Sequence, residues 1–442
     1  AGDSLYVAVW QGATSLADLA QIALIAHVLG LDEYGRFAVL VAFVMLVTQF
    51  FDVRVGVAAT TLGARELHRD PRRAAGIFQL SYLIDAVTGL LGFALVVALS
   101  FVVGPGLVGG NGTLLIVLFA TAVLASTVGD SSLAVLRLLD RYRLVATYTV
   151  GLEAARVGLL AGALLISEGL VPVILALLAQ RMLVTVVQVA TAATSFRAAM
   201  GRSLFRESAL DAVTDTRRQM ITTVLHTNVV SYARLAQTQL PTVVLGAISG
   251  PLQAGLYRIG MAAASAVGRL ADPAYAALLP RLSRLFAAGR RESVRRLIVQ
   301  SSLFSIPVMV AAFALVVALR EPILELLGGQ GATHAAPVLV AGAAAFAING
   351  AVFWNIGVLF AAGRTQVVAV IAVTAALTQV ALLIPLVVTL DATGAALAFL
   401  GSMALSNLLI TVIALRLLAR GDQGYACFSS SSHHIRSATS SE

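Results

Sequence analysis

The chain contains no lysine, a single cysteine at Cys427, and few charged residues for its length. Without lysine there is no P-loop ATPase site, whose phosphate cradle requires one, and a single cysteine excludes a disulfide framework. Charged residues make up 12% of the 442 residues, whereas soluble domains carry about 25%. No polar stretch is long enough to form a soluble domain with its own core, so a soluble enzyme on a membrane anchor is excluded.

Metal-binding and catalytic patterns are also missing. The six histidines show no ligand spacing, and no arrangement of nucleophile, base and acid can be argued from the sequence. We therefore expect no metal, no other cofactor and no catalytic residue.

Long hydrophobic runs dominate what is present. Hydrophobic residues make up 59% of the chain, and the mean hydropathy is +0.91. A helix needs about 20 apolar residues to cross a bilayer, and a barrel strand only about 9–11. Twelve runs of helical length occur, at residues 4–29, 35–63, 76–104, 113–138, 144–167, 171–196, 219–249, 253–287, 294–320, 334–362, 365–390 and 392–419. They predict an all-α polytopic membrane protein with about twelve transmembrane helices.

The arginines gather in alternate loops. Residues 65–73, 137–143, 197–218 and 281–296 hold most of them, while the intervening loops are very short and hold few. Because arginine-rich loops lie on the cytoplasmic side of membranes, we predict a multi-pass protein of the cytoplasmic (inner) membrane with both termini in the cytoplasm. The net charge of +8 then reflects topology and contact with the phospholipid membrane, and we expect no nucleic-acid partner.

An internal repeat relates the two halves of the chain. The sequence FALVVAL occurs at 93–99 and again at 313–319, an offset of 220 residues. The same offset superposes Gly30 on Gly250, Gly35 on Gly255, and Asp52 on Asp272. Six helices per repeat make the repeats parallel, with a substrate site expected between them near the midplane. The predicted domains are an N-terminal six-helix lobe at 1–197, a cytoplasmic inter-lobe linker at 198–218, a C-terminal six-helix lobe at 219–420 and a disordered cytoplasmic tail at 421–442.

Polar side chains recur along one face of the first, seventh and eighth runs, mostly at helical spacings of three and four. Polar faces cannot lie against lipid, so we predict a solvated central cavity between the lobes; a dry contact between helices is the alternative. The predicted cavity-lining residues are Gln11, Thr14, Asp18, Gln21, Gln49, Asp52, Ser231, Thr238, Ser265 and Asp272. Asp52 and Asp272 are first interpreted as symmetric bends in the helices, and only second as cavity groups.

Several charges interrupt the apolar runs, each costing about 2.5–3.5 kcal/mol near the bilayer centre. Glu153 and Arg156 are three residues apart and are predicted to neutralise each other. Arg54, Arg234 and Arg269 have fewer acidic neighbours, and a guanidinium group can bind phosphate oxygens in a bidentate manner. We predict that these three arginines bind a substrate diphosphate, the alternative being that they pair with acids to hold the lobes together.

Two acids are candidates for ion coupling. A carboxylate in a desolvated cavity can take up and release a proton during a transport cycle. Asp18 is the first candidate because it lies mid-helix on the polar face, and Asp85 is the second.

The sequences GLDEYGRFAVLVAF at 30–43, FFDVRVG at 50–56 and ADPAYAALLPRLSRLFAAGRRESVRRL at 271–297 resemble the signatures of Wzx-type polysaccharide flippases. These flippases belong to the multidrug/oligosaccharidyl-lipid/polysaccharide exporter superfamily. The resemblance implies alternating access of a polyprenyl-diphosphate-linked oligosaccharide, a cationic cavity and possible glycan polymerase partners. Twelve helices, rather than the fourteen usual in lipid II flippases, favour the O-antigen, capsule or exopolysaccharide branch.

Two other functions are considered. A multidrug and toxin extrusion-type cation antiporter shares the two-lobe plan but would need an acidic, aromatic cavity. A membrane glycan polymerase or ligase would need an acceptor site outside the membrane, and the short external loops argue against it. We therefore expect a secondary transporter rather than an enzyme.

Overall fold

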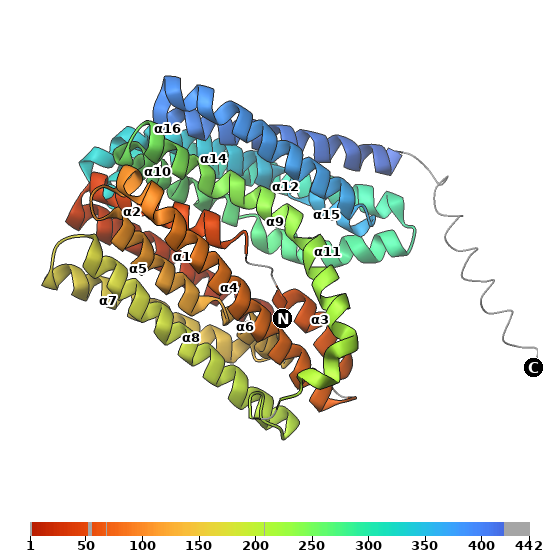
Figure 1. Ribbon diagram of the computed structural model, residues 1–442. Coiled ribbons are helices and arrows are strands. Elements are labelled where there is room, and N and C mark those ends of the chain that lie inside the picture. The colour runs from red at the N-terminus through yellow and green to blue at the C-terminus, as the bar shows by residue number, and fades with distance from the viewer. Residues whose placement is uncertain (1, 52–54, 68, 207, 420–442) are drawn as a thin grey trace, which may run out of the picture.

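The computed structural model describes residues 2–51, 55–67, 69–206 and 208–419. Within these ranges nearly every residue is helical and none forms a β-strand, which confirms the predicted all-α class. Figure 1 shows the helices gathered side by side along one common direction. Asp52 and Arg54, as well as the predicted tail with Cys427, lie outside the described residues.

The helices of the first half precede a short 3-10 helix that leads into the second half. In the first half they are α1 (Gly2–Leu29), α2 (Leu31–Thr48), α3 (Val55–Glu66), α4 (Pro71–Val108), α5 (Gly112–Ser126), α6 (Gly129–Leu138), α7 (Tyr142–Ile166) and α8 (Leu170–Met200). There follow η1 (Leu210–Val213), α9 (Thr214–Ile248), α10 (Pro251–Arg269), α11 (Asp272–Ala287), α12 (Arg291–Ala318), α13 (Arg320–Gly328), η2 (Gln330–Ala335), α14 (Ala336–Ala351), α15 (Trp354–Ala361) and α16 (Thr365–Ala419).

Each predicted apolar run falls on this helical structure. The last two runs share α16, whose chain reverses at Asp391, where φ is 47° and ψ is −131°; Figure 1 shows its two parts alongside each other. In the described part of the chain, eight helical stretches are long and apolar enough to cross a membrane. The protein is therefore a multi-pass membrane protein.

Four runs are each broken into two helices, and the breaks recur in both halves of the chain. The breaks separate α2 from α3, α5 from α6, α10 from α11, and α14 from α15. The break between Arg269 and Asp272 coincides with the predicted bend, and Pro273 occupies a first-turn position of α11, where its missing N–H is not needed. The breaks follow the predicted repeat, because the first pair lies close to the 220-residue offset and the second only slightly beyond it.

The two halves meet at a close backbone contact between α2 and α10. A Cβ added at Gly35 would overlap the carbonyl oxygen of Pro251, and one added at Gly255 would lie 2.9 Å from the carbonyl oxygen of Leu31. These four residues are pairwise equivalent at the 220-residue offset, so the contact is itself two-fold symmetric. We call this end of the bundle, where the chain turns at Gly30 and Gly250, the sealed end.

The turns at the sealed end have matching backbone conformations. Gly30 has φ 85° and ψ 167°, and Gly250 has φ 88° and ψ 172°. Positive φ is strained for residues with a Cβ, which explains why glycine occurs in both turns. Both turns precede a helix that packs against the other half of the chain.

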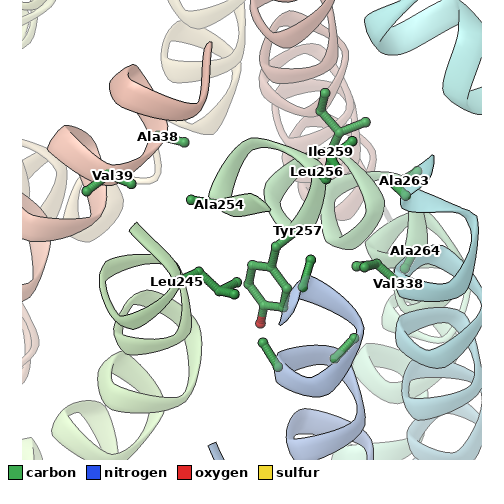
Figure 2. Close-up of a cluster of buried hydrophobic side chains, with 14 of the residues drawn as sticks. Ala38, Val39, Leu245, Ala254, Leu256, Tyr257, Ile259, Ala263, Ala264 and Val338 are labelled. Atoms are coloured by element: carbon green, nitrogen blue, oxygen red, sulfur yellow. The ribbon is translucent and has the colours of Figure 1, made fainter. Parts of the chain in front are cut away.

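Apolar packing continues the glycine contact toward the centre of the protein. Figure 2 shows Ala38 and Val39 of α2 facing Leu245 of α9 and Ala254 of α10, with Tyr257 beneath them. All of these side chains are buried. The sealed end is therefore a dry interface between the two halves.

At the opposite end, the segment between α8 and α9 packs on α4. The side-chain amide of Gln79 donates to the Leu204 carbonyl at 2.7 Å and accepts from the Ala209 N–H at 2.8 Å. Arg72 and Asp211 form a surface ion pair at 2.6 Å. The described part of the predicted inter-lobe linker is thus held on the first half of the chain.

The glycine contact generates a stability prediction. Alanine is favoured over glycine inside a helix by about 0.5–1 kcal/mol, yet Gly35→Ala and Gly255→Ala must push α2 and α10 apart. We expect both variants to lower the thermal unfolding midpoint in detergent. Gly12→Ala is the matched control, because a Cβ there meets open space within its helix. An unfolding midpoint in the Gly35→Ala variant equal to that of the control would contradict the close contact.

Candidate functional site

A central cavity of about 430 Å³ lies between helices of the two halves. Most of its polar wall comes from α1, α7 and α8 on one side and from α9 and α10 on the other. The polar and charged residues that line it are Ser15, Asp18, Gln21, Arg156, Arg181, Gln237, Thr238, Arg258, Ser265 and Arg269. Aromatic side chains complete the wall, among them Phe37, Phe119, Tyr257, Phe346 and Phe399.

Arginine dominates the charge of this cavity. Four arginines line it, and Asp18 is the one acid among the described lining residues. Arginine stays protonated when it is buried, so the cavity carries an excess of positive charge. Such a site favours an anion.

Arg156 is neutralised by two carboxylates. Its side chain, 8% exposed on α7, lies 2.9 Å from Asp18 of α1 and 2.9 Å from Glu153 one turn away. The predicted pairing of Glu153 with Arg156 is therefore confirmed. The ion pair with Asp18 joins helices far apart in sequence, so Arg156 fixes α1 against α7.

The other three arginines have a different environment. In the described part of the chain, no carboxylate lies within 4.0 Å of Arg181, Arg258 or Arg269. Arg181 comes from α8, while Arg258 lies near the middle of α10 and Arg269 is its last residue. A ligand in the cavity would therefore meet cationic groups on both of its walls.

The structure places five of the thirteen predicted cavity-lining and diphosphate-binding residues in the wall of the central cavity. Asp18 and Gln21 of α1, Thr238 of α9, and Ser265 and Arg269 of α10 all line it. Asp18, Gln21 and Thr238 lie within their helices, whereas Ser265 and Arg269 lie near the C-terminal end of α10.

The other predicted residues within the described part of the chain fall outside this wall. On α1 the wall begins at Ser15, after Gln11 and Thr14; on α9 it begins at Gln237, after Ser231 and the exposed Arg234. Asp272 lies beyond the break that ends α10. The polar faces of these helices continue past the cavity, because a helical spacing can repeat along a whole helix. The cavity occupies only a few turns of each helix. Asp52 and Arg54, outside the described residues, cannot be placed.

Sequence reasoning does not assign Arg156 or Arg181 to the cavity, and Arg156 is interpreted there only as the local partner of Glu153. Arg258 lies on the polar face of the eighth run, although it is not among the residues predicted to line the cavity. Arg181 did carry a signal, because it is an isolated charge in the middle of an apolar run. An intramembrane charge without a local partner is by default a candidate functional residue.

A second cavity, of about 210 Å³, lies within the first half of the chain. Gln49, which the sequence predicts for the central cavity, lines this second cavity instead. Asp85, the second candidate for ion coupling, also lines it. Asp85 is buried on α4 and accepts a hydrogen bond from Ser131 of α6. Arg181 lines both cavities.

The same fold occurs in solved membrane transporters. An inward-facing multidrug resistance MATE family transporter of the MOP superfamily aligns with a TM-score of 0.66 and 14% identity, covering 92% of this chain and 94% of that one. The lipid II flippase MurJ in an inward closed conformation aligns with a TM-score of 0.64 and 12% identity, covering 94% and 91%. No curated protein matches the chain.

The likeness to these structures shows the fold of the chain, and its apolar helices make it a multi-pass membrane protein. The chain belongs to the polysaccharide biosynthesis protein family, whose model matches residues 2–286. The resemblance inferred from the sequence signatures is thereby confirmed.

The two ion pairs of Arg156, with Asp18 and with Glu153, lead to a second stability prediction. The Glu153 side chain is 15% exposed, whereas that of Asp18 is 48% exposed. Removing one partner of a buried ion pair is more costly than removing a solvated one. We expect Glu153→Gln to lower the unfolding midpoint more than Asp18→Asn does. A larger loss in Asp18→Asn would contradict this ranking.

Proposed function

We propose that the protein moves a polyprenyl-diphosphate-linked oligosaccharide, such as an O-antigen, capsule or exopolysaccharide repeat unit, from the cytoplasmic to the outer leaflet by alternating access. The observation that carries the proposal is the central cavity with four arginines and one described acid in its wall. Membership of the polysaccharide biosynthesis protein family supports the choice of a glycan carrier.

A diphosphate head group must leave water to cross the membrane, and its hydration has to be replaced. Guanidinium groups replace it well, because their donors match two phosphate oxygens at once. Arg181, Arg258 and Arg269 are the proposed head-group ligands, since Arg156 is already engaged by two carboxylates. The hydroxyl and amide groups of Gln237, Thr238 and Ser265 suit sugar hydroxyls beside them.

A cation antiporter of the multidrug extrusion type has the same fold and is the second candidate. The partly exposed carboxylate of Asp18 in the cavity favours it. However, Asp18 is paired with Arg156, and the excess of arginine would repel an organic cation. The charge of the cavity therefore supports the flippase.

The head-group proposal makes a graded mutational prediction. A charge-assisted hydrogen bond contributes about 1.5–3 kcal/mol, so Arg269→Ala should weaken binding about ten- to a hundredfold. Arg269→Lys should be intermediate because lysine lacks the bidentate fork. Arg234→Ala should have a smaller effect, since the exposed Arg234 is outside the wall, although the sequence alone predicts otherwise.

The measurement is leaflet accessibility of a fluorescent polyprenyl-diphosphate oligosaccharide in proteoliposomes, with unfolding midpoints as a control for folding. Normal transport by a stably folded Arg269→Ala variant would contradict the head-group role. Transport of organic cations but not of the glycolipid would favour the second candidate.

The proposal also requires an orientation in the cytoplasmic membrane. The arginine-rich loops should face the cytoplasm, with the sealed end facing outward. In a Cys427→Ser background, a cysteine placed within 281–296 should react with an impermeant reagent only from the cytoplasm, and one within 168–170 only from outside. The reverse pattern would contradict the orientation.

A further inference from the structure

Pro241 interrupts the backbone hydrogen bonding of α9 beside the central cavity. Proline has no N–H, so the carbonyl group four residues before it, that of Gln237, loses its partner within the helix. Gln237 and the next residue, Thr238, both line the central cavity. The interruption in α9 therefore falls at the wall of the proposed binding site.

A side chain of another helix supplies the missing hydrogen bond. The amide of Gln379, in the part of α16 before Asp391, donates to the Gln237 carbonyl at 2.9 Å. The amide oxygen of Gln379 accepts from the Ser402 hydroxyl, in the part of α16 after Asp391, at 3.1 Å. Both side chains are buried, with Gln379 only 1% exposed. A buried amide that is bonded through its nitrogen and through its oxygen is held in one orientation.

These two side chains support the cavity wall from behind. Gln379 and Ser402 are not among the residues that line the central cavity, but each is bonded to one that is. Gln379 holds the backbone of Gln237, and the Ser402 hydroxyl lies 2.9 Å from the carbonyl oxygen of Phe399. Losing the Gln379 bond would shift Gln237 and Thr238 without removing a polar group from the wall.

We infer that Gln379 is a positioning residue that sets specificity for the sugar next to the diphosphate. It replaces the hydrogen bond that Pro241 removes and so fixes Gln237 and Thr238 where the sugar hydroxyls bind. The inference rests on the proposed function, in which these two residues face the glycan. Hydrogen bonds weaken steeply when their angles depart from the optimum, so recognition of hydroxyls depends on this placement.

Binding of the diphosphate should not depend on Gln379. The arginines proposed as its ligands come from α8 and α10, and their charge acts over a longer range than a neutral hydrogen bond. Loss of the Gln379 bond should therefore weaken recognition of the sugar selectively. A substitution that merely loosened the protein would weaken binding of the sugar and of the diphosphate together.

The test compares two soluble probes on the purified full-length protein in nanodiscs. Farnesyl diphosphate carries no sugar, and glucosyl farnesyl diphosphate carries one. The sugar gain is the ratio of their dissociation constants. In the wild type it should be about tenfold, as expected for one or two neutral hydrogen bonds.

Two variants grade the effect of the Gln379 bond. Gln379→Met keeps the length of the side chain but removes the donor, so it should abolish the sugar gain and leave the affinity for farnesyl diphosphate unchanged. Ser402→Ala keeps the donor but releases the amide oxygen, and should reduce the sugar gain only in part.

Asn407→Leu is the matched control for destabilisation. Asn407 is a buried amide of α16, bonded to Asn355 at 3.2 Å and to the Met403 carbonyl at 3.0 Å, and is not among the residues that line the central cavity. Its loss should lower the unfolding midpoint, as that of Gln379 should, but leave the sugar gain as in the wild type.

Pro241→Ala tests whether the proline and the amide act as a pair. Alanine restores the N–H that can bond to the Gln237 carbonyl within α9, so the amide of Gln379 loses its acceptor. Gln379→Met should then lower the unfolding midpoint in the proline background but not in the alanine background. The two substitutions together should reduce the sugar gain no more than either does alone, which is the non-additivity of coupled residues.

Three results would overturn the inference: farnesyl diphosphate binding without any sugar gain in the wild type, a wild-type sugar gain in Gln379→Met, or a loss of sugar gain in Asn407→Leu equal to that in Gln379→Met. Failure of the proposed function is distinguishable, because the wild type would then bind neither probe. The role in specificity would fall with it, while the unfolding midpoints of the Pro241 and Gln379 variants would still measure the hydrogen bond itself.

Discussion

A charge inside a membrane must be paired or must face water, and this constraint organises the first half of the protein. Arg156 is held between Asp18 and Glu153 at 2.9 Å from each. The pairing places α1 beside α7 and turns the polar face of α1 toward the space between the halves. The central cavity, its lining and the position of its remaining arginines follow from that orientation.

In the described part of the second half, several buried polar side chains bond to one another through neutral groups. Asn355 donates to Asn407 at 3.2 Å and to Thr411 at 3.1 Å, and Gln379 donates to the Gln237 carbonyl at 2.9 Å. Neutral networks of this kind rigidify a core when every member is satisfied. Among the described residues, the second half contributes charge to the central cavity only through the arginines of α10. The two halves therefore have a similar arrangement of helices, but the first holds buried ion pairs where the second holds neutral hydrogen bonds.

The parts of this architecture that depend on local sequence could be predicted. The apolar runs predict the helices, and the spacing of Glu153 and Arg156 predicts their ion pair. The 220-residue offset matches Gly35 with Gly255 but does not predict that the two lie at one contact. Which residues enter the cavity depends on the depth at which helices separate, and that is a property of packing. For this reason the sequence does not reveal that Arg234 lies outside the cavity wall and that Arg181 lies in it. The second cavity could not be predicted, because its oxygen atoms come from helices far apart in sequence.

The central claim is that a diphosphate head group is held between α8 and α10. The most direct measurement is photo-crosslinking with a polyprenyl diphosphate whose reactive group lies beside the phosphates. We expect crosslinks on residues that line the central cavity next to Arg181, Arg258 and Arg269, and we expect excess unlabelled lipid to suppress them. Crosslinks confined to the outer surface, such as the exposed Leu165 and Ile166 of α7, would contradict the account.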